Sequence, residues 1–92
     1  MLKLRYTRQF KKDFKKAQKR GLPMNELKTV LEILAAGKTL SPVYRDHSLQ
    51  GEYISFRECH IRPDWLLIYR IHEDVMELIA QRTGSHSDLF DE

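Results

Sequence analysis

The apolar run Trp65-Leu66-Leu67-Ile68-Tyr69 decides the fold class of this 92-residue chain. Such a nearly continuous run is typical of a central β-strand that is buried on both faces. Arg62-Pro63-Asp64, just before it, is a turn signal, because proline presets φ for the second position of a turn. Residues 53–61 contain β-formers interrupted by charges, so we expect them to form the preceding strand of a hairpin.

The chain after this run continues the sheet. Residues 72–74 are a polar break, residues 75–82 indicate another strand, and Thr83-Gly84 is expected to turn the chain. Ser85 and Asp88 match the acidic variant of a capping box, which predicts a short terminal helix. Consecutive strands joined by tight turns predict an antiparallel meander.

The first forty residues change to the helical period. Residues 2–6 alternate like a half-buried strand, and Thr7 fits an N-cap. Apolar side chains then recur at helical spacing in two segments, residues 8–20 and 23–36, separated by Gly21-Leu22-Pro23. The sequence therefore predicts one α+β domain spanning residues 1–92, in the order β-α-α-β-β-β with a short C-terminal helix. The two-helix hairpin is expected to cover one face of the antiparallel sheet.

Composition narrows the class of protein. The chain is 41% apolar and 32% charged, as expected for a folded single domain and not for a disordered one. Cys59 is the only cysteine, so no internal disulfide is expected, and a reducing compartment is the natural setting. The N-terminus alternates charge with leucine, unlike a signal peptide, and no apolar stretch could span a bilayer. We expect a cytoplasmic protein that does not contact membranes.

Positive charge is concentrated at the N-terminus. The first twenty residues hold nine lysines and arginines and only one acid, whereas the whole chain carries +3. Such a block is an electrostatic footprint for a phosphate backbone or an acidic protein partner. A solvated helix face is an equally good explanation from this feature alone. The candidate contact residues are Lys11, Lys12, Lys15 and Lys16.

Three of the four histidines, His47, His60 and His86, fall at predicted strand ends or loops. Histidine titrates near neutral pH and can both accept and donate a proton. RNA cleavage needs both steps, because the ribose 2′-OH loses a proton as it attacks phosphorus and the departing 5′-oxygen gains one. Arg82 could stabilise the negative charge on the phosphate. His72, beside two acids, is expected to be structural.

Other candidate residues have structural alternatives. Asp64 could take part in the site or only cap the turn at Pro63. Trp65 could stack on a base, although at a strand start it is more often a core residue, and Phe90 could stack on a nucleotide or tuck the tail down. The sequence has no CxxC, HExxH or Gly-rich phosphate loop, so no metal or cofactor is expected. Cys59 is expected to be buried and inert.

Three motifs resemble a known family. Residues 44–51 look like the DHxLxG segment of YafQ-type toxins, and residues 57–69 look like their R-x-x-H-x-x-P-D-W core and the apolar strand after it. Residues 82–90 look like their R-T-G-(T/S)-H-x-x-L-F ending. The helical half is similar too. The chain thus resembles, over essentially its whole length, the YafQ-type toxins of the RelE/ParE superfamily.

The resemblance implies more than the residues alone do. Such proteins are toxins of type II toxin–antitoxin modules that enter the ribosomal A site and cleave mRNA there without a metal. It implies a RelE-like fold, ribosomal RNA as a partner for the basic helix, and a cognate antitoxin, expected in a heterotetrameric complex. By position it assigns acid/base chemistry to His47, His60, Asp64 and His86, phosphate stabilisation to Arg82, and substrate contact to Trp65 and Phe90. We expect His86 to be the base, with His60 and His47 as acid or transition-state support.

RelE itself depends more on Lys, Arg and Tyr, so the roles of residues within a histidine site do not transfer from it directly. Two alternatives to an RNA-cleaving enzyme remain open. A non-catalytic member of the fold could instead block another target such as DNA gyrase, and would be indifferent to His86. A general RNA-binding module would depend on the basic helix alone.

Overall fold

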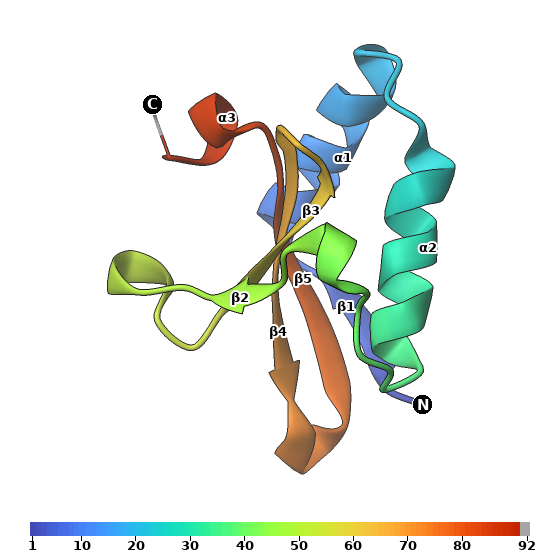
Figure 1. Cartoon of the computed structure of the whole chain (residues 1–92), viewed down its shortest axis with the longest axis vertical. Coiled ribbons are helices and arrows are strands. Elements are labelled where there is room, and N and C mark those ends of the chain that lie inside the picture. Colours follow the sequence, from blue (N-terminus) through green and yellow to red (C-terminus); the bar gives the residue numbers. More distant parts are fainter. Residues whose placement is uncertain (91–92) are drawn as a thin grey trace.

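The computed structural model describes residues 1–90, and it has the expected α+β composition (Figure 1). The elements follow one another as β1 (Lys3–Tyr6), α1 (Arg8–Lys19), α2 (Met24–Ala35), β2 (His47–Ser48), β3 (Arg57–Arg62), β4 (Trp65–His72), β5 (Glu77–Gly84) and α3 (His86–Phe90). The N-terminal strand, the helical hairpin, the three-strand meander and the short C-terminal helix are therefore confirmed.

The sheet is mixed, and not purely antiparallel as the sequence suggested. Its strand order is β1-β5-β4-β3-β2, in which β2 to β5 are antiparallel neighbours and β1 runs parallel to β5. The difference arises because β1 and β5 are far apart in sequence, so no turn fixes their relative direction. The two-residue strand β2 was expected to be loop. It pairs His47 with Glu58, which brings His47 onto the sheet.

Strand β4 is buried on both faces, as its composition predicted. Trp65, Leu67 and Tyr69 pack into the larger core with α1 and α2, while Leu66 and Ile68 pack into a smaller cluster on the opposite face. This division follows from the two-residue period of a strand. Figure 1 shows α1 and α2 lying together on one side of the sheet. The other face is left uncovered by α1 and α2, and the smaller cluster there includes Leu89 of α3.

Local signals place the helix ends where the sequence predicted them. The hydroxyl oxygen of Thr7 accepts a hydrogen bond from the backbone N–H of Phe10 at 2.9 Å, which is N-capping of α1. Gly21 has a φ of +77°, a conformation that glycine adopts without steric cost and that stops the helix. At the other end of the chain, Ser85 and Asp88 form the expected capping box of α3.

The predicted boundaries were wrong at the start of β3 and at both ends of β5, which was expected at residues 75–82. Strand β3 begins at Arg57 and not at residue 53, because residues 51–53 form a 3-10 turn. Strand β5 runs from Glu77 through Gly84, so Thr83 and Gly84 are part of the strand and do not form a turn. Thr83 is kept in the strand by its register with Leu67 and by its buried side chain. The β-propensities of these segments indicate neither the 3-10 turn at residues 51–53 nor the pairing of Thr83 with Leu67.

Candidate active site

Three histidines from different elements stand in a row on the face of the sheet that α1 and α2 leave free. Cys59 and Ile61 of β3 point into the helix-side core, so His60 between them points to the opposite face. The ring centroid of His60 lies 6.3 Å from that of His47 in β2 and 5.7 Å from that of His86 at the start of α3. The structure therefore brings together the three histidines that the sequence singled out.

His86 is held by Asp64, which lies in the turn between β3 and β4. One carboxylate oxygen of Asp64 is 2.7 Å from Nδ1 of His86 and accepts the backbone N–H of the same residue at 2.9 Å. These two hydrogen bonds, the backbone one first, lower the pKa of Asp64 below its usual range. Because a carboxylate only accepts, Nδ1 of His86 donates to it, so that in the neutral imidazole the lone pair is on Nε2.

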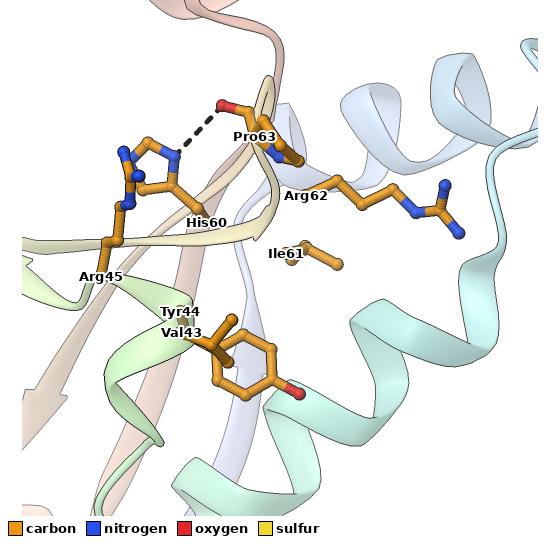
Figure 2. A pocket seen from close by; sticks show the side chains of 7 residues that line it. All are labelled: Val43, Tyr44, Arg45, His60, Ile61, Arg62 and Pro63. Carbon is orange, nitrogen blue, oxygen red and sulfur yellow. Dashed lines mark hydrogen bonds between the residues drawn. The ribbon is translucent and has the colours of Figure 1, made fainter.

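His60 and Asp64 flank the turn at Pro63, and the hydrogen bonds of Asp64 are to His86. Nδ1 of His60 instead lies 3.2 Å from the carbonyl oxygen of Pro63, a contact drawn in Figure 2. Nε2 of His60 lies 3.3 Å from the carboxylate of Glu58. Both partners are acceptors, so each nitrogen of the His60 ring has a neighbour to which an N–H can donate.

Glu58 is a site residue that sequence reasoning missed. Its side chain is only 6% exposed, and it faces Nε2 of His60 at 3.3 Å and Nε2 of His47 at 3.8 Å. A signal was present, because Glu58 and His60 are two residues apart on one strand and so must share a face. The buried carboxylate supplies negative charge to both imidazoles from the same side.

Beside His60 the surface is hollowed into a depression of about 510 Å³, shown in Figure 2. Its floor is apolar, and Arg45 and Arg62 stand at its sides. The guanidinium of Arg62 is already paired with Glu26 of α2, at 2.7 and 2.9 Å. The full lining is Val43, Tyr44, Arg45, His60, Ile61, Arg62 and Pro63.

Arg82 lies in β5 and is fixed by Asp13 of α1, a second residue that sequence reasoning missed. Nε and Nη2 of Arg82 donate to the two carboxylate oxygens of Asp13 at 2.8 and 3.2 Å, and the backbone N–H of Thr83 donates to the same carboxylate at 3.2 Å. Asp13 is 8% exposed, and its carboxylate raises the pKa of Arg82, with a smaller contribution from Tyr53. The guanidinium is therefore oriented, with Nη1 outside the Asp13 pair.

The two predicted aromatic contacts have different outcomes. Trp65 is 2% exposed, packs in the helix-side core, and donates its indole N–H to the hydroxyl of Thr83 at 3.0 Å. A ring this buried cannot stack on a base, so the structural alternative holds for Trp65. Phe90 is half-buried, with its ring centroid 6.5 Å from that of His86 and 6.0 Å from that of Tyr53. Phe90 therefore borders the histidine row.

The lysines of α1 lie outside the histidine row. Lys11, Lys12 and Lys15 are exposed along the helix. Lys16 differs, because its ammonium group contacts Asp88 of α3 at 3.3 Å. The charged surface of α1 is therefore available to a partner, and one end of it is engaged within the protein.

Three donor groups of the site are spaced closely enough to share a metal ion. The imidazole nitrogens of His47 and His60 and a carboxylate oxygen of Glu58 all lie within 4.8 Å of one another. Two imidazoles and a carboxylate suit Zn²⁺ or Cu²⁺. Cys59 does not join them, because it is fully buried on the opposite face, and burial raises the pKa of its thiol to about 12. The expected inertness of Cys59 agrees with this environment.

Within residues 1–90, no helix combines the length and apolarity that a membrane span requires.

The mixed sheet, the one-sided helical hairpin and the histidine row define a small α+β domain with a candidate acid/base site. The model for the family described as "Bacterial toxin of type II toxin-antitoxin system, YafQ" matches residues 2–91. The mRNA interferase toxin YafQ of Escherichia coli K12 is 41% identical over 88 residues, which cover 95% of this chain and 94% of that protein. The chain therefore belongs to the YafQ family of type II toxins.

Solved structures agree. A metal-bound toxin from Helicobacter pylori superposes with a TM-score of 0.92 at 42% identity, covering 98% of this chain and 100% of the other. The toxin chain of the E. coli DinJ–YafQ complex superposes with a TM-score of 0.89 at 41% identity, covering 98% and 99%. The expected family, the fold and the enzyme class of the relatives, an mRNA-cleaving toxin, are thereby confirmed.

Proposed function

We propose that this chain, like its E. coli relative, is an mRNA interferase: a cytoplasmic endoribonuclease that cuts mRNA in the ribosomal A site by metal-independent acid/base catalysis. The observation that carries the proposal is the row of three histidines, in which the Asp64–His86 pair leaves one imidazole lone pair free. That arrangement supplies a base. The neighbouring His60, between two acceptors, supplies an acid.

The base in this proposal is His86. Asp64 accepts the Nδ1 proton, fixes the ring orientation, and stabilises the imidazolium that forms when Nε2 removes the proton from the ribose 2′-OH. The 2′-oxygen then attacks phosphorus, the bond to the 5′-oxygen breaks, and a 2′,3′-cyclic phosphate forms. DNA has no 2′-OH and is not cut.

The acid is His60, whose ring centroid lies 5.7 Å from that of His86. The contact of its Nε2 with Glu58, at 3.3 Å, is long enough to give way when the 5′-oxygen approaches and takes the proton. His47 and Arg82 add positive charge around the phosphate, which stabilises the negative charge of the transition state. Phe90, beside His86, is placed to contact the nucleotide base.

The cognate antitoxin is the expected inhibitor. The E. coli relative has been solved in complex with DinJ. For this chain we propose an antitoxin with an acidic toxin-wrapping segment, because the first twenty residues are strongly basic. Ribosomal RNA would use the same charge, so that antitoxin and ribosome compete for the toxin.

Induction in bacteria tests the proposal, with wild type beside His86→Gln and primer extension on a reporter mRNA. We expect wild type to arrest growth and cut within codons, and His86→Gln to do neither while still folding and binding the antitoxin. His72→Gln is the matched control, because His72 lies at the far end of β4. If His86→Gln arrests growth as wild type does and the mRNA stays whole, a blocking toxin replaces the proposal.

Metal binding is a second candidate role, favoured by the three donor groups within 4.8 Å. We infer that Zn²⁺ or Cu²⁺ held by His47, Glu58 and His60 would inhibit cleavage, since it would take the nitrogens that must carry protons. Cleavage on purified ribosomes should persist with a chelator selective for Zn²⁺ over Mg²⁺ and should fall when Zn²⁺ is added. Loss of cleavage on chelation would overturn the metal-independent mechanism.

A further inference from the structure

The short helix α3, which begins with His86, is tied to the basic helix α1 through one carboxylate. Asp88 accepts hydrogen bonds from Nη1 and Nη2 of Arg20 at 2.6 and 3.1 Å, and from Nζ of Lys16 at 3.3 Å. The arginine contact is bidentate, the geometry in which an arginine–carboxylate pair is strongest and most directional. These three residues, Asp88, Arg20 and Lys16, are called the α1–α3 clamp below.

The same carboxylate also holds the turn that leads into α3. One of its oxygens accepts the backbone N–H of Ser85 at 3.0 Å, and the backbone N–H of Asp88 donates to the hydroxyl of Ser85 at 3.1 Å. A Cβ atom on Gly84 would lie only 3.0 Å from Cβ and Oδ2 of Asp88. His86 lies in the chain between Ser85 and Asp88, and both of these residues are held by the hydrogen bonds between them. The α1–α3 clamp therefore controls the position of the His86 backbone.

Helix α3 needs such support because it cannot hold itself in place. It has five residues, of which Leu89 alone is buried among those that the structure describes. Helices this short are unstable without tertiary contacts. Hydrogen bonds from Arg20, Ser85 and Lys16 hold the pKa of Asp88 well below its usual range, so its carboxylate is charged at all physiological pH values.

We propose that Asp88, gripped by Arg20 and Lys16, is a positioning residue that sets the His86 imidazole against Asp64 and His60. The catalytic consequence rests on the proposed function, whereas the positional effect does not. It follows that part of the positive charge on α1 acts inside the toxin and is not reserved for RNA.

The test compares Arg20→Gln and Asp88→Asn, which remove the ion pair, with Arg20→Lys, which keeps a cation. Lys19→Gln is the matched control, since it removes one positive charge from the position just before Arg20, at the end of α1. Among residues 1–90, Lys19 has no recorded ion pair. Two readouts are used. Two-bond ¹H–¹⁵N correlations of the imidazole report the tautomer of His86, and single-turnover cleavage on programmed ribosomes reports the saturating rate and the half-saturating concentration.

In wild type and Lys19→Gln we expect His86 to show one tautomer, with the proton on Nδ1. Arg20→Gln and Asp88→Asn should show mixed tautomers and a saturating cleavage rate lower by about tenfold or more, because a misplacement of about 1 Å can cost ~100-fold. The half-saturating concentration of Arg20→Gln should change no more than that of Lys19→Gln. Arg20→Lys should recover most of the rate.

Identical ring signals and rates in Arg20→Gln and Lys19→Gln would overturn the proposal. A shift in half-saturating concentration alone would do so too, because it would place Arg20 in RNA binding. If wild type cleaves nothing, the proposed function fails, and the tautomer comparison still decides whether the clamp positions His86. Circular dichroism and Tm, measured for every variant, show that each one is folded.

Discussion

Replacing Asp13 by Asn should destabilise the protein through Arg82. The Asp13 carboxylate accepts two hydrogen bonds from the guanidinium and one from the backbone of Thr83, and its side chain is 7% exposed. Asparagine keeps the shape but loses the charge, and its amide N–H₂ would face the donors of Arg82. Breaking a fully buried pair costs about 3–5 kcal/mol. Since the Arg82 side chain is 20% exposed, we expect a loss of about 2–3 kcal/mol.

Urea unfolding followed by circular dichroism measures this loss of stability. In thermal unfolding, Tm should fall by about 10–20 °C in a domain of this size. Arg5→Gln is the control. It breaks the Arg5–Glu77 pair, which is 3.4 Å long with the Arg5 side chain 63% exposed, and it should cost less than about 1 kcal/mol. The cycle of Asp13→Asn, Arg82→Gln and the double variant should show a coupling of at least about 1 kcal/mol. Equal losses in Asp13→Asn and Arg5→Gln would refute the argument.

Three further predictions concern the core, the pH dependence and the entry into α3. Cys59 should react slowly with a thiol reagent at pH 8 in the native protein and quickly after unfolding, because burial raises its pKa to about 12; fast native reaction would contradict the buried environment. The pKa of Asp88 is lower in the folded than in the unfolded protein, so its stabilising contribution is complete above about pH 4 and is lost as pH falls further. Acid unfolding curves should therefore be less steep for Asp88→Asn than for wild type, and equal slopes would exclude this contribution. Gly84→Ala should cost about 1–3 kcal/mol and reduce cleavage, because its Cβ would lie 3.0 Å from Asp88; unchanged Tm and activity would show that the turn has room to relax.

Local sequence patterns were enough to predict most of the secondary-structure elements. The apolar run that begins β4, the cap at Thr7 and the capping box at Ser85 are each local features of a few residues, and each was predicted correctly. The parallel pairing of β1 with β5 was missed, because those strands are joined only through the whole length of the chain.

The amino-acid sequence by itself determined the candidate residues for the chemistry: histidines at strand ends and loops, an arginine near the C-terminus, and a basic first helix. Tertiary structure alone decided their partners. Asp64 bonds His86 and not His60, Glu58 lies behind two histidines, and Asp13 reaches Arg82 across 69 positions of the chain. The physical reason is that side-chain type is a local property, whereas hydrogen-bond partnership and burial depend on which distant segments the folded chain brings together.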